Sequence, residues 1–203
     1  PSTQFTCMLN AILLTALVSV VYASFFEWTL HKYFMHRPFG AFTYAFKAHA
    51  QVHHTIFKYD ETYHLRKEED KHTIHMAWWN GPLLILISCI PFAAAGWHLC
   101  AWTMPLTAAG ILALYYGAYE YLHWCMHLPR KRGIERSGIF FRLNGHHVLH
   151  HRYTNRNFNV VFPLADLCFG TLLICSKVRF KQVVGPMVPN LQPREPRQRP
   201  ASV

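Results

Sequence analysis

Three stretches of the chain are almost purely hydrophobic, and the charged residues lie between or after them. The stretches are residues 7–26, 76–97 and 99–119, and none contains an Asp, Glu, Lys or Arg. Each has about twenty residues, the length that an α-helix needs to cross roughly 30 Å of hydrocarbon. We predict an all-α integral membrane protein with three to four transmembrane helices, in which the second and third spans form a tight hairpin around His98.

The first span is predicted to be a membrane anchor rather than a cleaved signal peptide. A signal peptide begins with a basic region and ends at a small-residue cleavage site. Here no basic residue precedes the apolar run, and residues 27–31 continue it without a break. The chain starts with Pro instead of Met, which leaves open a further N-terminal span.

The segments outside these spans predict shorter helices and a tail. Residues 42–57 and 139–151 are expected to be helical, whereas residues 157–176 contain a proline, a glycine and Asp166 and are expected to pack on the helices instead of crossing the membrane. Residues 1–180 then form a single membrane-embedded domain. The basic, Pro-rich residues 181–203 are expected to be disordered.

Charge is distributed unevenly along the chain, and this predicts the orientation. The net charge is +10, and all 20 Lys and Arg residues lie in two segments, residues 32–71 and 130–199. The positive-inside rule places both segments on the cytoplasmic side of a bacterial inner membrane or the endoplasmic reticulum. Basic flanks of membrane spans explain the charge more simply than nucleic-acid binding does, so no nucleic-acid partner is expected.

Histidine is the most informative residue type in the chain. Ten of the 15 histidines fall into four tight clusters, each of which lies at or beyond the end of the first or third span, so all four can converge on one membrane face. Ten imidazoles are too many for one first-row metal ion, which accepts at most about six ligands. We therefore predict a two-metal centre in a cytoplasmic helical cap. The predicted ligands are His31, His36, His49, His53, His54, His123, His127, His147, His150 and His151.

Helical spacing refines this prediction. His123 and His127 are four residues apart, so their Cβ atoms lie about 5–6 Å apart on one helix face. Adjacent histidines point about 100° apart on a helix, so His150 and His151 suit two different ions, and the cluster at residues 49–54 allows the same division. His31 and His36 are five positions apart, so they would point about 140° apart on an α-helix. One of them is therefore expected where the helix frays. Imidazole suits Fe, Zn, Cu and Ni alike.

Four carboxylates are candidates for orienting these ligands. A buried acid is costly unless it is paired, and accepting the Nδ1–H of a ligating histidine would provide a partner and fix the tautomer of the ring. The stronger candidates lie one helical turn before a histidine at the end of an apolar span. They are Glu27 and Glu120, and the weaker candidates are Asp60 and Asp166.

The order and spacing of the clusters resemble the fatty acid hydroxylase and sterol desaturase superfamily of integral-membrane oxygenases. The pattern is His-x4-His, His-x3-His-His, His-x3-His and His-x2-His-His, and residues 157–166 (Asn-Phe-Asn-Val-Val-Phe-Pro-Leu-Ala-Asp) with Phe-Gly-Thr at 169–171 resemble the family as well. The resemblance covers about residues 27–171. It implies a non-haem di-iron centre that zinc can occupy in purified protein, O2 as co-substrate, and a fatty-acyl, sphingolipid or sterol C–H as the site of hydroxylation or desaturation. It also implies an external electron donor such as cytochrome b5, ferredoxin or a similar reductase.

Two features depart from the family pattern. The second cluster has three residues, where the family usually has two, between its first and second histidines, so His49 is its least secure ligand. The fourth cluster carries an extra His146, and His64 resembles a histidine that some sterol-type members place after the second cluster. His64 and His146 are therefore possible additional ligands.

Other functions stay open at this stage. The first cluster, residues 31–36, also resembles the carotenoid hydroxylases of the same superfamily. A membrane metal transporter would place its ligands at mid-membrane, where these spans are nearly free of them, and a zinc-stabilised scaffold would need no turnover. Aromatic residues could line a lipid groove, although interface anchoring suits Trp78 and Trp79 better. The groove candidates besides that pair are Tyr115, Tyr116, Tyr119 and Tyr121.

Overall fold

The computed structural model describes residues 2–130 and 132–174, and this part of the chain is helical with no strand. The all-α prediction is therefore confirmed. In chain order the elements are α1 (Ser2–Leu30), a π-helix (His31–Met35), α2 (Tyr44–Phe46), a second π-helix (Lys47–His53), α3 (His54–Ile56), 3-10 helices at Glu61–Tyr63 and Glu68–Thr73, α4 (Asn80–His98), α5 (Thr103–His127), a 3-10 helix (Ile134–Arg136), α6 (Gly138–Arg152) and α7 (Leu164–Cys168).

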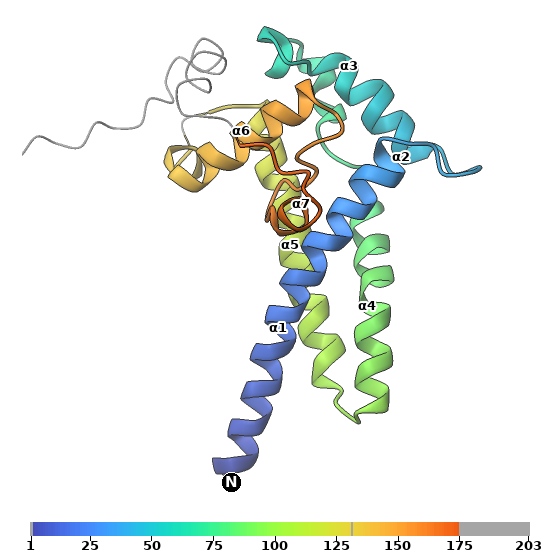
Figure 1. Ribbon diagram of the computed structural model, residues 1–203, viewed down its shortest axis with the longest axis vertical. Helices are drawn as coiled ribbons and strands as arrows, with labels where there is room; N and C mark the ends of the chain where they lie inside the picture. The colour runs from blue at the N-terminus through green and yellow to red at the C-terminus, as the bar shows by residue number, and fades with distance from the viewer. Residues whose placement is uncertain (1, 131, 175–203) are drawn as a thin grey trace, which may run out of the picture.

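Three long helices, α1, α4 and α5, stand side by side, and the shorter elements gather at one end of them (Figure 1). Small residues allow the close approach, because Ala23 of α1 and Ala108 of α5 are buried with Phe92 and Leu112 in one apolar cluster. The ring of Tyr22 meets Phe92 edge-on at 5.4 Å. The long helices thus form a stem, and the polar segments form a cap on it.

Two of the helical segments are long and apolar enough to cross a membrane, Gln4–Met35 and Asn80–His98. Only 22% of the most apolar window of each is buried within the fold, so most of their apolar side chains face outward. Helix α5 is not among these segments, because the tyrosines and Glu120 in its second half lower its hydropathy. A third span and the orientation of the protein in a membrane therefore stay predictions.

Both π-helices occur where histidines are five residues apart. The His36 N–H bonds to the His31 carbonyl at 3.1 Å, and the His54 N–H bonds to the His49 carbonyl. Such i→i+5 bonds widen the turn, and short π segments are frequent at functional sites. As expected, one member of the first cluster lies at a helix end, since His36 is the C-cap residue of the π-helix. The wider turn, which was not expected, stacks the His31 and His36 rings with 5.1 Å between their centroids.

The shorter predicted elements lie close to their expected positions. Continuous helical structure runs through residues 44–56, and α6 covers the predicted 139–151. Residues 157–174 do not cross the stem but fold beside it with the short helix α7 (Figure 1). The domain boundary at residue 180 and the tail at residues 181–203 lie outside the described residues.

Candidate metal centre

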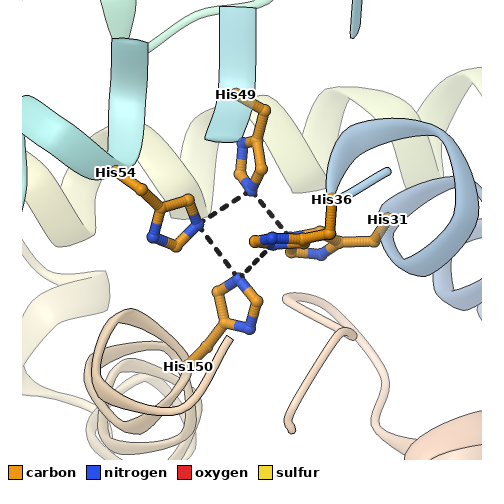
Figure 2. A group of neighbouring side chains, drawn as sticks. All are labelled: His31, His36, His49, His54 and His150. Atoms are coloured by element: carbon orange, nitrogen blue, oxygen red, sulfur yellow. Dashed lines mark hydrogen bonds between the residues drawn. The ribbon is translucent and has the colours of Figure 1, made fainter. Parts of the chain in front are cut away.

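Five histidines from four helical segments converge at the top of α1, and we call them the first histidine group. Their ligand nitrogens all lie within 4.8 Å of one another, and Figure 2 shows the rings pointing at a common centre. The Nε2 atom of His49 is 2.9 Å from that of His31 and 3.0 Å from that of His54. The group comprises His31, His36, His49, His54 and His150.

Four more histidines, all buried, form the second histidine group. Its members also offer ligand nitrogens within 4.8 Å of one another, and they are His53, His123, His127 and His147. His151 adjoins this group, with its Nε2 atom 3.1 Å from the Nε2 of His147. The structure thus brings all ten predicted histidines together. The neighbours His53 and His54 go to different groups, the division that their spacing predicts.

Backbone carbonyls orient most of these rings. In six of the ten histidines Nδ1 lies 2.5–3.2 Å from a main-chain oxygen, so Nδ1 carries the proton and Nε2 keeps its lone pair. The pairs are His31 with Phe158, His53 with Thr73, His123 with Ile74, His127 with Tyr63, His150 with Arg156 and His151 with Phe57.

The contacts between Nε2 atoms cannot all be hydrogen bonds. A ring nitrogen carries either one proton or one lone pair, yet the Nε2 of His147 faces those of both His127 and His151, at 3.0 and 3.1 Å. His150, whose Nε2 has the lone pair, likewise faces His36 at 3.0 Å and His54 at 3.2 Å. Metal–imidazole bonds of about 2.0–2.1 Å place two ligands about 2.9 Å apart at right angles and about 3.4 Å apart in a tetrahedron. The observed spacings fit a cation between the rings.

Burial keeps these imidazoles neutral, which is the form that binds metal. Desolvation lowers the pKa of His36 to about 4 and that of His150 to about 3, and it lowers the pKa values of His49 and His147 as well. In the second group, the Nε2 of His53 is buried with no hydrogen-bond partner among the described residues, and so is that of its neighbour His123. Such orphaned nitrogens would be costly without a ligand, so the residues present fit two metal ions.

The role predicted for the two helical carboxylates is wrong. Glu27 does not take the Nδ1–H of His31, because the Phe158 carbonyl does so at 2.5 Å. Instead Glu27 accepts from the Val160 N–H at 2.6 Å and from Tyr115 Oη at 2.7 Å. Glu120 likewise leaves His123 to the Ile74 carbonyl and contacts other groups. Both side chains reach neighbouring segments rather than the rings.

The segment that follows α6 supplies two carbonyls that accept from rings of the first group, and Asp166 holds the backbone of this segment in place by hydrogen bonds. This fully buried carboxylate accepts from the N–H groups of Phe158 at 3.0 Å and Asn159 at 2.7 Å, and from Thr171 Oγ1 at 2.6 Å. Asn157 adopts a left-handed φ of 53° between Arg156 and Phe158, whose carbonyls accept from His150 and His31. Asn tolerates this conformation better than most residues. Asp166 therefore supports His31 and His150 through the backbone.

The remaining candidates lie apart from the two groups. Asp60 caps the 3-10 helix Glu61–Tyr63 at the surface, where it accepts from the Thr62 N–H, so its predicted role beside a ligand is wrong. Neither His64 nor His146 offers a ligand atom to either group. His64 is buried beside the ring of Tyr63, and the His146 carbonyl accepts from the Asn157 side chain.

An apolar cavity lies directly below the first group, between α1, α4 and α5. Its empty volume is about 620 Å³ with its open mouth included, and its walls run along α1 from Ala23 to His31 and Met35. Twelve residues of helix correspond to about 18 Å. Three of the predicted groove aromatics line it, Tyr115, Tyr116 and Tyr119. By contrast Trp78 and Tyr121 are exposed, and Trp79 contacts the ring of Tyr44. The sequence thus suggested three of the lining residues but not the contact of the cavity with His31, because its other walls are ordinary helix residues.

Comparisons with family models, with curated proteins and with solved structures found no match for this chain. The resemblance to the membrane oxygenases therefore rests on the sequence pattern alone, and the two groups show only that the histidines could hold metal ions.

Proposed function

We propose that this protein is an integral-membrane, O2-dependent di-iron oxygenase that hydroxylates or desaturates the hydrocarbon chain of a lipid. The fatty-acyl, sphingolipid and sterol classes are the substrates we favour. The proposal combines the two histidine groups with the apolar stem and with the family resemblance of the histidine spacing.

The observation that carries this proposal is the contact between the cavity and the first histidine group. His31 contributes both to the cavity wall and to the group. The cavity surface is almost wholly apolar, and α1 and α4, which help to line it, have mostly outward-facing apolar side chains. A hydrocarbon chain entering from the bilayer would therefore reach the metal ligands without crossing water.

The residues of the chain would hold, orient and shield the reacting groups. Neutral imidazoles from the stem and cap would bind the two irons, and the backbone carbonyls would fix their tautomers. The irons would supply the reduction of O2 and the removal of hydrogen from an unactivated C–H. Hydroxylation balances as R–H, O2, two electrons and two protons giving R–OH and water. The electrons would come from an external donor of the cytochrome b5 or ferredoxin kind.

The position of the ligands favours this function over metal transport. A transporter binds its ion near mid-membrane, along a path through the helices. Both histidine groups instead lie at one end of the long helices, in the cap (Figure 1). We propose that this end faces the cytoplasm, because the Lys and Arg residues within residues 32–71, 130, 132 and 136–156 belong to the segments at this end.

The test measures metal content and oxygen incorporation together. Full-length protein in detergent or nanodiscs, loaded with Fe(II) and supplied with a reductase system and membrane lipids, should form a product only when O2 is present. With 18O2, a hydroxylated product should carry one labelled atom. Two tightly bound zinc ions and no turnover of any lipid with iron would overturn the oxygenase and favour the scaffold. A carotenoid product would keep the oxygenase and change the substrate class.

A further inference from the structure

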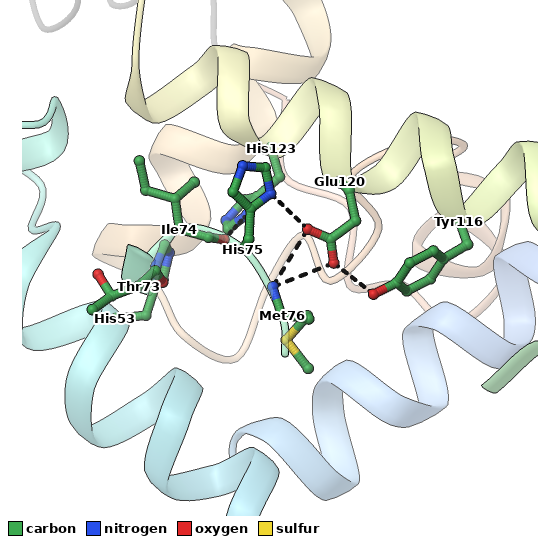
Figure 3. A network of polar contacts seen from close by, with 8 residues as sticks. All are labelled: His53, Thr73, Ile74, His75, Met76, Tyr116, Glu120 and His123. Atoms are coloured by element: carbon green, nitrogen blue, oxygen red, sulfur yellow. Dashed lines mark hydrogen bonds and ion pairs between the residues drawn. The ribbon is translucent and has the colours of Figure 1, made fainter. Parts of the chain in front are cut away.

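A short strap, residues 73–76, runs past the second histidine group between the cap and α5. Two consecutive carbonyls of the strap each accept from a ligand ring, Thr73 from His53 at 3.2 Å and Ile74 from His123 at 3.0 Å (Figure 3). The strap therefore orients two of the four members of that group. Any shift of these two carbonyls would move both rings together.

Glu120 on α5 attaches to the far end of this strap. Its two carboxylate oxygens each lie 3.4 Å from the Met76 N–H, and Oε2 lies 3.0 Å from His75 Nδ1 (Figure 3). Tyr116, one turn earlier on α5, donates its hydroxyl to Oε1 at 2.8 Å. The carboxylate is thus directed at the strap from its own helix. Its side chain is 17% exposed.

The attachment lies close to the ligands it would control. Glu120 and His123 are three residues apart on α5 and therefore lie on the same side of the helix. The strap thus contacts α5 at two points: the Met76 N–H donates to Glu120, and the Ile74 carbonyl accepts from His123. Ile74 is itself buried. The first histidine group has a different support, the carbonyls of Arg156 and Phe158. A disturbance at Glu120 should therefore reach only the second group.

We propose that Glu120 is a positioning residue for the second metal site, acting through the strap rather than on any ligand ring. This inference rests on the proposed two-metal centre. Glu120 holds Met76 so that the Thr73 and Ile74 carbonyls stay aligned with His53 and His123. Both Nε2 atoms then point at the same ion.

The experiment uses the full chain, from which a chelator has removed all metal. The protein is titrated with Co(II) alone, and the titration measures the number of Co(II) ions bound per chain and the affinity of each site. Glu120→Asp keeps the charge but withdraws the carboxylate by one methylene from Met76. It should leave the first site unchanged and weaken the second by about 10–100-fold, the usual effect of losing an outer partner of a metal ligand. Glu120→Gln keeps a side-chain oxygen at the same reach and should restore most of the second affinity.

Glu135→Asp is the matched control, because Glu135 is likewise a carboxylate that accepts backbone N–H groups, those of Arg130 and Arg132, but it belongs to neither histidine group. It should bind two Co(II) ions like the wild type. Unchanged second-site affinity in Glu120→Asp would overturn the inference, as would a Glu120→Gln variant that folds but loses as much as Glu120→Asp. If the wild type itself binds fewer than two ions, the proposed function fails, which is a distinct result.

Discussion

Replacing Asp166 with asparagine should weaken the first metal site selectively. Asp166 touches no histidine, but its two oxygens hold the backbone whose carbonyls orient His31 and His150. The substitution keeps the shape of the side chain. It changes one hydrogen-bond acceptor into an amide NH2, which is a donor.

The size of the effect follows from the contacts. Oδ1 accepts from Phe158 N and Thr171 Oγ1, whereas Oδ2 accepts from Asn159 N at 2.7 Å. An amide oxygen in the Oδ1 position keeps the first two partners, but the Asn159 N–H then faces an NH2 group in a fully buried site. A buried N–H without a partner costs about 1–3 kcal/mol. Relief of this cost by movement of the segment would displace the Phe158 carbonyl from His31, so we expect first-site affinity to fall about 10–100-fold.

Competition between the protein and a chromophoric chelator for Co(II) measures this effect, with both sites resolved as separate steps. Asp60→Asn is the control, because Asp60 is also an aspartate that accepts a backbone N–H, but at the surface. It should leave both affinities unchanged. A folded Asp166→Asn protein with wild-type first-site affinity would refute the view that the backbone segment orients the ligands.

Three further predictions test the ligands, their protonation and the cavity. His150→Ala should abolish turnover while membrane insertion stays intact, whereas His98→Ala, at the exposed end of α4, should change neither. Product analysis measures turnover, and carbonate extraction of membranes measures insertion. Protons compete with metal for Nε2, and burial lowers the pKa of His36 to about 4 and that of His150 to about 3. The affinity for Co(II) should therefore stay nearly constant from pH 7 to 5.5 and fall below about pH 4. If the ligand histidines had an ordinary pKa, the affinity would already be about tenfold lower at pH 5.5. Co(II) titrations at several pH values decide between these outcomes. Leu84→Trp, at a partly buried position in the cavity wall, should fill the cavity, abolish turnover of long-chain lipids and leave metal content unchanged, at a packing cost of about 1–3 kcal/mol. Normal turnover would place the substrate elsewhere.

The convergence of the histidines could be predicted from the sequence, because each cluster follows a span and helical spacing fixes relative directions. The π-turns could not, since a five-residue spacing is compatible with a frayed end or a widened turn. In the structure His36 lies at the helix end, and its N–H bonds to the His31 carbonyl across a widened turn. The sequence also predicted that the second span begins at residue 76, whereas α4 begins at Asn80. The residues just before Asn80 are apolar and therefore continue the hydrophobic pattern, but they are not helical.

The support of the rings could not be predicted, because backbone carbonyls carry no residue-type signal. Glu27 and Glu120 lie one turn from a histidine in sequence, and this proximity suggested direct contact. Their side chains extend instead to N–H groups of segments far along the chain, Val160 and Met76. Only the folded arrangement shows that these carboxylates attach the segments whose carbonyls meet the rings.

The two histidine groups have separate supports and differ in their relation to the cavity. His31 of the first group lines the cavity directly, and Tyr119, another lining residue, stacks on His123 of the second group with 5.7 Å between ring centroids. A chain held in the cavity would therefore lie against His31 of the first group, with Tyr119 between it and the second group. The adjacent residues His53 and His54 contribute to different groups. Ligands on the helices set the spacing of the centre, and the irregular segments at residues 73–76 and 156–158 set the orientation of its rings. Loss of one irregular segment should thus disable one group and leave the other formed.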